Sequence, residues 1–261
     1  AIHAEGLRSL RLEGLRFDMP VPGLGQVTLT ADKLELALSF SDILHAGNSV
    51  GHAKITGAHL VVHISEQSPA PSSGTGSGEV SLEPVLSKLP PLDFQGDNCM
   101  VEACLSQDRP PILIKDMAFI ASKEAESSEI RLYVSATALA ETSECNIKID
   151  TVYRSPDVLD AMIEVAGFTP EHLAPVMEIP EGIAGDLALR LHAFGAINRQ
   201  MMVELALDLN NVEMPPLAEM PDIIDLKSAT LNAGMQLDIA TRQLHIFQTT
   251  MSTALFDAAF Q

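Results

Sequence analysis

The sequence is poor in aromatic and basic residues. It has no Trp, two Tyr and nine Phe in 261 residues, and sites that stack sugars or nucleic-acid bases are built from aromatic faces. Its 16 Lys and Arg stand against 35 Asp and Glu, which gives a formal net charge of −19. Such a charge repels nucleic-acid phosphates and anionic lipid headgroups. The composition therefore argues against a nucleic-acid partner and against electrostatic attachment to a membrane surface.

Long apolar runs and a complete set of cysteine pairs are also missing. No run reaches the roughly 18 apolar residues that a membrane-spanning helix needs, although 46% of the residues are hydrophobic. The three cysteines, Cys99, Cys104 and Cys145, are an odd number, so free thiols are the expected state. The chain begins without an initiator Met or a signal peptide, which suggests an excised or processed piece and leaves open an anchor upstream of it.

Alternation of apolar and polar residues with period two is the main pattern present, and it predicts β-strands. It is clearest in residues 182–213, where two alternating arms flank a short connection at 195–199. Each arm of this predicted hairpin has about 12 residues, roughly twice the usual strand length. One face of the hairpin is aliphatic, and such a face needs a core or an apolar ligand to cover it.

The rest of the chain divides into further strands and a few short helices. Strands are expected over 7–18, 26–39, 50–64, 92–105, 111–121, 128–139, 143–153, 223–239, 242–250 and 252–260. Short helices are expected at 41–46, near 82–89 and over 156–177, where Ser155-Pro156 is typical of a helix start. The Ser-, Pro- and Gly-rich stretch 66–80 predicts a flexible excursion. It separates an N-terminal β unit, 1–65, from a continuation of the sheet, 81–261.

A six-residue pattern recurs, in which two apolar residues five positions apart flank a small residue. Its copies are LEGLRF (12–17), ITGAHL (55–60), FQGDNC (94–99), LKSATL (226–231) and, more loosely, IKDMAF (114–119). In a regular strand an odd spacing puts the two apolar residues on opposite faces, so a kink or bulge must return them to one face. Repeated kinks curl a sheet. The predicted fold is β-rich α+β, with a long, curved, mostly antiparallel sheet shaped like a groove and a few short helices.

These units resemble the AsmA-like family, bridge-like lipid transfer proteins of the Gram-negative envelope. The resemblance rests on LPPLDFQGDNCMVEA (89–103), on the strand, helical turn and kinked strand of 29–62, and on the paired arms of 183–209. Members are typically tethered to the inner membrane and project into the periplasm, where an aliphatic groove is thought to carry phospholipid toward the outer membrane. The resemblance implies the same location, with a membrane tether outside this chain, and a role in phospholipid transport or outer-membrane homeostasis. It also implies phospholipid or fatty-acyl ligands, no enzymatic activity and no cofactor.

The predicted lipid-binding residues are aliphatic side chains of the hairpin and of one N-terminal strand. They are Leu187, Leu189, Leu191, Met201, Val203, Leu205 and Leu207, together with Leu34, Leu36 and Leu38. The same side chains would equally line the closed core of a sandwich, and the sequence leaves that choice open. A closed core favours a second hypothesis, a non-catalytic structural or adaptor module of the envelope that docks another protein at an open sheet edge.

Motifs that resemble catalytic or metal sites lack the required context. Residues 47–51 match the G-x-S-x-G nucleophile elbow, but here the expected strand follows Ser49 instead of preceding it. His59 and His63 lie about 13 Å apart on a predicted strand, too far to share one metal ion. The glycine-rich stretch TGSGEV lacks the lysine of a phosphate-binding loop. No catalytic, metal-binding or cofactor-binding residue is predicted.

Overall fold

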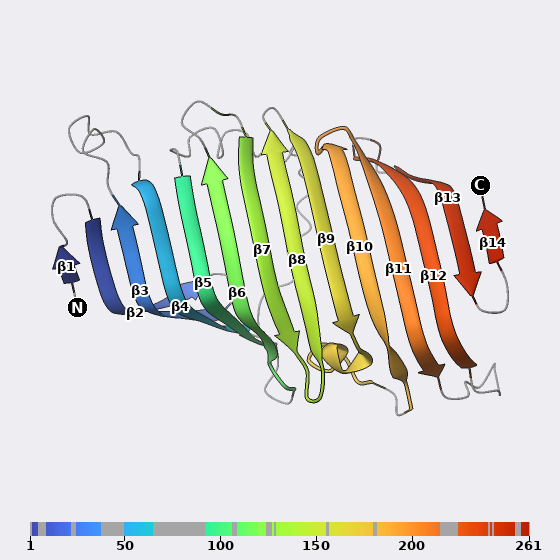
Figure 1. The fold of residues 1–261 in the computed structure, drawn as a ribbon, viewed down its shortest axis with the longest axis horizontal. Helices are drawn as coiled ribbons and strands as arrows, with labels where there is room; N and C mark the ends of the chain where they lie inside the picture. The colour runs from blue at the N-terminus through green and yellow to red at the C-terminus, as the bar shows by residue number, and fades with distance from the viewer. Residues whose placement is uncertain are drawn as a thin grey trace.

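The computed structural model describes residues 2–4, 9–21, 25–37, 50–64, 92–105, 109–123, 127, 129–154, 157–179, 182–214, 224–239, 241, 243–253 and 257–260. Within these ranges, fourteen strands form one open sheet and lie side by side in chain order (Figure 1). Neighbouring strands are antiparallel, with the exception of β4 and β5, which run parallel. The prediction of a β-rich, curved, mostly antiparallel sheet is confirmed.

The strands are long. They are β1 (Ile2–Ala4), β2 (Ser9–Val21), β3 (Gly25–Ala37), β4 (Val50–Ile64), β5 (Leu92–Cys104), β6 (Ile112–Lys123), β7 (Glu129–Leu139), β8 (Glu144–Arg154), β9 (Val158–Phe168), β10 (Ala184–Ala196), β11 (Gln200–Met214), β12 (Ile224–Asp238), β13 (Gln243–Thr253) and β14 (Asp257–Phe260). The predicted hairpin is β10 and β11, with arms of 13 and 15 residues. No strand is predicted for β1 or β9, and β14 begins five residues later than expected. The other strand ends lie within a few residues of those expected from the alternation.

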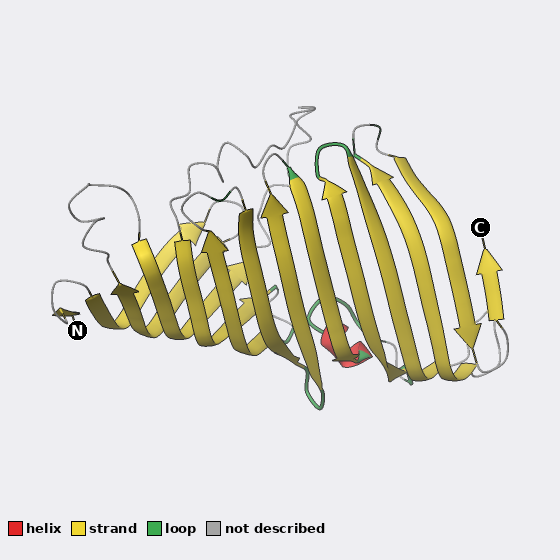
Figure 2. Ribbon diagram, turned by 45° about the horizontal axis from the view of Figure 1, so that its top comes forward, coloured by secondary structure: helices red, strands yellow, loops and turns green. Residues whose placement is uncertain are grey.

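The N-terminal strands bend where the six-residue pattern predicts kinks. Backbone φ is positive at Gly14 (61°), Gly57 (62°), Asn98 (51°) and Asp116 (51°), and Figure 2 shows the strands from β2 to β6 bending sharply. At each of these positions the alternation changes phase, which keeps the apolar side chains on one face. Two of the copies differ from the prediction in detail: the kink in 94–99 falls at Asn98 instead of the glycine, and Ser228 of 226–231 has no positive φ.

Gly96 is needed for a different reason. It lies opposite Phe119 of the neighbouring strand, and a Cβ built on Gly96 would lie only 2.0 Å from the Phe119 Cε1 atom. The absent side chain therefore leaves room for the ring, which packs edge-on against Phe94 with centroids 5.1 Å apart. Asn98 adopts the left-handed conformation instead, because Asn tolerates it better than most residues.

One face of the sheet, which we call the inner face, carries an unbroken row of apolar residues across the strands. Successive cross-strand partners from β2 to β12 are Leu12, Leu34, Ile55, Gly96, Phe119, Val134, Ile149, Ile163, Leu191, Leu205 and Ala233. In the bent strands this face lies inside the bend, because residues from both sides of a kink pack into one cluster. Phe94 and Cys99, five positions apart, both belong to it.

The opposite, outer face carries the charged residues. Ion pairs join neighbouring strands there, including Lys54 Nζ to Asp97 Oδ2 at 2.5 Å and Arg190 Nε to Glu164 Oε1 at 2.9 Å. Such exposed pairs each contribute little to stability. Their position shows that the register places polar side chains in water and aliphatic side chains on the inner face.

The helix predicted over 156–177 is wrong for most of its length. Residues Val158–Phe168 form β9, which pairs with β8 on one edge and β10 on the other, and only Pro170–Leu173 are helical, as the single 3-10 turn η1. Leu159 and Ile163 fit a helical spacing, but Leu159, Ala161, Ile163 and Val165 also alternate with period two. Because two flanking strands supply ladder hydrogen bonds, the strand is formed. The α+β class is therefore overstated for the described residues, which are almost entirely β.

Several predictions fall on residues outside the described ranges. These are the helical segments at 41–46 and 82–89, the excursion at 66–80 and Leu38. The pairing around the excursion is nevertheless informative, since β4 and β5 are parallel neighbours from Val50 beside Leu92 to His63 beside Cys104. The N-terminal unit and the continuation after residue 81 therefore share one sheet.

Deleting part of the connection between β4 and β5 should be tolerated only down to a minimum length. Because β4 ends and β5 begins at opposite ends of the parallel pair, the connection has to return along the bent strands, a distance of up to about 40 Å. An extended chain covers at most about 3.3–3.6 Å per residue. Deleting 66–75 should change stability little, since loop-closure entropy varies slowly with length. Deleting 66–88 should abolish the parallel pairing. Thermal unfolding followed by circular dichroism checks this, and equal melting temperatures for both variants would contradict the parallel register.

Candidate functional site

The structure brings the predicted hairpin residues together on the inner face. Leu187, Leu189 and Leu191 of β10 lie directly opposite Leu209, Leu207 and Leu205 of β11, while Val203 faces Ala193 and Met201 faces Gly195. The predicted Leu34 and Leu36 of β3 lie on the same face, opposite Leu12 and Leu10. The predicted lipid-binding residues do not include the inner-face neighbours of the hairpin on β9 and β12, which are Ile163, Val165, Leu231 and Met235. Their period-two alternation is the signal that would have identified them.

The inner face is open to solvent across the described part of the sheet. The hairpin leucines are half-buried. Among the described residues, nine apolar residues are buried and most of them are small: Ala31, Ala53, Ile55, Ala58, Cys99, Ala136, Cys145, Tyr153 and Ala229. A second packed layer would bury the large aliphatic side chains instead.

An apolar pocket of about 280 Å³ lies where the chain after β9 turns over the ends of β10 and β11. Its lining consists of Phe168, Pro170, Leu173, Met177, Glu178, Ile179, Ile183, Ala184, Gly185, Asp186, Leu187, Leu209 and Val212. Backbone kinks occur in all three strands at this end, at Gly167 (φ 77°), Gly185 (φ 125°) and Asn211 (φ 48°). The pocket includes Leu187 and Leu209, so it is continuous with the inner face.

The segment that forms one wall of this pocket, residues 169–179, which we call the strap, begins with η1 near the end of β9 (Figure 1). The Glu171 carboxylate accepts hydrogen bonds from the Thr142 backbone N–H (3.3 Å), the Thr142 hydroxyl (2.9 Å) and the Ser143 hydroxyl (3.2 Å). These bonds lower the pKa of Glu171. The Phe168 ring also stacks on His172, with centroids 5.2 Å apart. The strap is thus fastened to the turn between β7 and β8.

Replacing Glu171 by Gln should lower the melting temperature at pH 7, and the difference should disappear in acid. Because hydrogen bonds lower the folded-state pKa of Glu171 from its usual value of 4.5, its contribution is present above pH 4.5 and is lost as the pH falls through the folded-state value. Below that value the wild-type side chain is neutral, as glutamine is. Thermal melts of the wild type and Glu171→Gln at several pH values test this. The same difference in melting temperature at pH 3 and at pH 7 would contradict the hydrogen bonds assigned to the Glu171 carboxylate.

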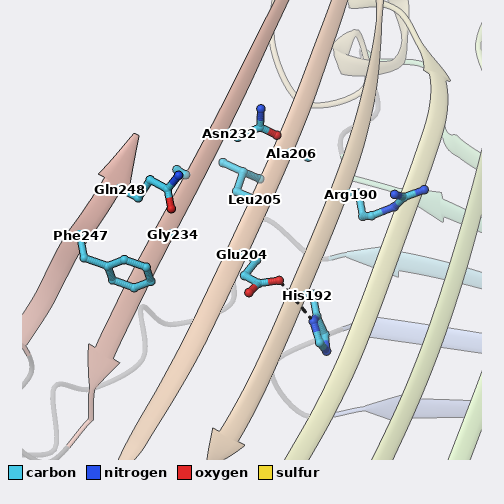
Figure 3. A pocket seen from close by; sticks show the side chains of 10 residues that line it. Arg190, His192, Glu204, Leu205, Ala206, Asn232, Gly234, Phe247 and Gln248 are labelled. Atoms are coloured by element: carbon cyan, nitrogen blue, oxygen red, sulfur yellow. Dashed lines mark ion pairs between the residues drawn. The ribbon is translucent and has the colours of Figure 1, made fainter. Parts of the chain in front are cut away.

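A second hollow, also of about 280 Å³, lies on the outer face between β10, β11, β12 and β13 (Figure 3). His192 Nε2 lies 2.8 Å from Asp160 Oδ1, and its Nδ1 lies 3.7 Å from Glu204 Oε2. The Phe247 ring covers Gly234, where a Cβ would lie 2.6 Å from the ring. Among the described residues of its lining there is no Ser, Thr or Cys, so His192 has no hydroxyl or thiol nucleophile beside it here.

The other motifs singled out in the sequence do not assemble a site in the described residues. His52 pairs with Asp93 at 2.9 Å and His59 with Glu102 at 3.4 Å, each across to β5. Within the described ranges, no three His, Cys, Asp or Glu side chains gather closely enough to hold a metal ion. Ser49 lies outside those ranges. In the same part of the chain, no helix combines the length and the apolar character needed to cross a membrane.

The three cysteines are free thiols. Cys99 and Cys145 are each 1% exposed, and burial raises the pKa of both thiols. Cys104 lies on the same strand as Cys99 and is half-buried. The residues are therefore packed parts of the sheet, in which the thiolate form is disfavoured at Cys99 and Cys145.

A thiol reagent should therefore distinguish the three cysteines. Cys104 should react first with a chromogenic disulfide at pH 8, whereas Cys99 and Cys145 should react only after unfolding, because they are inaccessible and their pKa values are raised. Mass spectrometry of the modified peptides, with and without urea, gives the order. Reaction of native Cys99 as fast as Cys104 would show that the inner cluster opens readily.

In the part of the chain that the structure describes, the fold and the inner face together define a class: an open, curved, single-layered β-sheet with one continuous apolar face. Neither a scan against protein-family models nor a search of curated proteins found a match to this chain.

Proposed function

We propose that this protein binds the acyl chains of phospholipids or fatty acids along its inner face. We further propose that it acts as a non-catalytic, AsmA-like component of phospholipid transport or outer-membrane homeostasis. It would work in the periplasm, held at the inner membrane by a tether outside this chain. The observation that carries the proposal is the apolar inner face, which runs unbroken from β2 to β12 while its large side chains stay only half-buried.

The dimensions and chemistry of the inner face suit an acyl chain. At roughly 4.8 Å between strands, the row from β2 to β12 extends about 50 Å, which is longer than one acyl chain. A bound chain would move along this row without meeting a charged group, since the charged partners lie on the outer face. Each buried methylene contributes about 0.8 kcal/mol, so affinity needs no specific polar contact. A net charge of −19 gives no preference for anionic headgroups.

Lipid extraction tests the proposal directly. The protein is purified from bacterial membranes without detergent exchange, extracted with organic solvent and analysed by mass spectrometry, alongside an unrelated protein taken through the same steps. Co-purified phospholipid in this protein alone is the expected result. A fluorescent fatty acid titrated into delipidated protein gives the affinity. Absence of both bound lipid and titratable binding would refute the proposal.

The sheet edges favour a second candidate, an envelope adaptor that pairs with a strand of another protein. Among the described residues, β14 pairs only with Thr249–Ser252 of β13, which leaves the outer edge of 243–248 without a strand. Leu244 and Ile246 on that stretch are 55% and 59% exposed. Unpaired edges with exposed apolar side chains are templates for strand addition.

A photo-crosslinking amino acid at position 246 separates the two candidates. An adaptor should give one discrete crosslinked protein in cells, and His245→Lys should abolish it, because a charged edge residue discourages pairing. His245 lies opposite Gln236 on the outer face, so lipid binding at the inner face should be unaffected by that substitution. Absence of any crosslinked protein would eliminate the adaptor at this edge.

A further inference from the structure

The pocket under the strap differs from the rest of the inner face because it has two walls. Leu187, Leu209 and Val212 form the wall on the hairpin, and Leu173 and Met177 of the strap form the wall facing them. Elsewhere on the inner face, in the part of the chain that the structure describes, an apolar ligand would touch protein on one side only. A ligand segment in this pocket would therefore lose more contact with water than anywhere along the row.

We propose that this pocket holds the methyl end of a single acyl chain, with the rest of the chain lying along the β10–β11 hairpin. The inference rests on the proposed lipid-binding function and adds a defined end point to it. A bound tail leaves the pocket beside the pair Leu187 and Leu209 and continues onto the next pair, Leu189 and Leu207. Both pairs lie on the inner face, so the path from pocket to hairpin is continuously apolar.

The charges around the pocket favour the methyl end over the headgroup. Among the described residues that line it, the charged ones are Glu178 and Asp186, and none is Lys or Arg. The Asp186 carboxylate accepts a hydrogen bond from Asn210 Nδ2 at 3.1 Å. A fatty-acid carboxylate or a phosphate in the pocket would thus meet two like charges and no cation. An uncharged methyl end meets no such penalty.

The backbone around the pocket is shaped by residues that tolerate unusual conformations. Gly185 has a φ of 125°, and a Cβ at this position would lie 2.9 Å from the Val212 Cα, so only glycine lets the two strands approach here. Asn211, beside Val212, has a φ of 48°. The strands therefore bend at the level of the pocket, where the strap crosses to meet them.

The strap supplies a matched pair of test positions. Met177 is 51% exposed and lines the pocket, whereas the adjacent Val176 is 54% exposed and does not. A glutamate at either position adds the same charge to the same segment. Neither side chain belongs to a buried core, so both variants should fold, and circular dichroism verifies this.

Fatty acids carrying a photoreactive diazirine locate the two ends of the bound chain. One probe has the diazirine at the methyl end and the other has it beside the carboxylate. After irradiation of the whole protein, the methyl-end probe should modify peptides covering 170–179 and 209–212. The carboxylate-end probe should modify other inner-face peptides. In Met177→Glu, the modification of 170–179 and 209–212 by the methyl-end probe should fall about tenfold, because the acyl tail would contact a charge. In Val176→Glu, the modification of the same peptides should stay within about twofold of the wild-type level.

The outcomes separate this inference from the proposed function. One outcome is that the wild type binds both probes but the methyl-end probe modifies the inner face evenly; another is that Met177→Glu and Val176→Glu are modified to the same extent. Either outcome refutes a tail site in the pocket under the strap, while lipid binding at the inner face stands. If the wild type binds neither probe, both proposals fail together. Only preferential modification at the pocket, lost in Met177→Glu and kept in Val176→Glu, supports the tail site.

Discussion

Replacing Leu205 by Asp should leave the protein folded and remove most of its acyl-chain binding. Leu205 lies on the inner face between Leu191 and Ala233 and is half-buried, so water can reach a carboxylate there. Losing the partial burial of one leucine should cost about 1–2 kcal/mol, whereas an unpaired charge in a closed core would cost about 3–5 kcal/mol. Fatty-acid affinity should fall at least about tenfold, because the chain would lie against a charge.

The matched control for this variant is Ala206→Asp, one residue further along β11. It adds the same charge on the outer face, opposite Arg190, and should change neither stability nor binding much. Denaturant unfolding gives the free energies, and titration with a fluorescent fatty acid gives the affinities; Leu189→Asp repeats the test on β10. The contrary result is that Leu205→Asp does not fold, Ala206→Asp does, and the wild type binds no lipid. That result would indicate that the inner face is covered and would favour the adaptor.

Replacing Gly57 by Ala should destabilise the bent half of the sheet by about 2–5 kcal/mol. Gly57 has a φ of 62°, and a Cβ there would lie 2.1 Å from Asp32 Oδ2 and 2.7 Å from Asp32 Cγ. The left-handed conformation costs an alanine about 1–2 kcal/mol, and the displaced Asp32 side chain adds an overpacking cost of about 1–3 kcal/mol. Urea unfolding of both proteins measures the difference.

Gly14→Ala is the control that separates the two costs. Gly14 has a φ of 61°, but nothing lies within 4 Å of the position that a Cβ would take. This variant should therefore lose only the cost of the left-handed conformation, about 1–2 kcal/mol of the free energy of unfolding. In an Asp32→Ala background, Gly57→Ala should cost about the same as Gly14→Ala. Losses below about 0.5 kcal/mol in both glycine variants would mean that the strands do not bend at these residues.

The bends and the lipid proposal are physically linked. Without a kink, Phe94 and Cys99 would lie on opposite faces, since they are five positions apart; with it, both belong to one inner cluster. The kinks thus keep the inner face apolar along the full length of each bent strand. They also turn this face toward the inside of the bend, where side chains from both sides of the kink pack into one cluster.

The strand positions and the inner-face side chains follow from the sequence because alternation is a local property of an extended chain. Leu187, Leu189 and Leu191 share a face whenever β10 is a strand, whatever lies beside it. The kinks at Gly14 and Gly57 follow as well, because two apolar residues five apart conflict with a regular strand. In β5 the prediction of a bend is right but its residue is not, since a neighbouring ring occupies the space that Gly96 leaves.

Strand β9 and the strap pocket are decided by tertiary structure. Residues 158–168 satisfy both a helical and a strand spacing, and the hydrogen bonds of β8 and β10 select the strand. The pocket joins the strap to Leu209 and Val212, far apart in the chain. The sequence by itself determines which side chains share a face, because that depends on neighbours a few residues away. Only the tertiary structure decides what covers that face, because coverage depends on which distant segments return across the sheet.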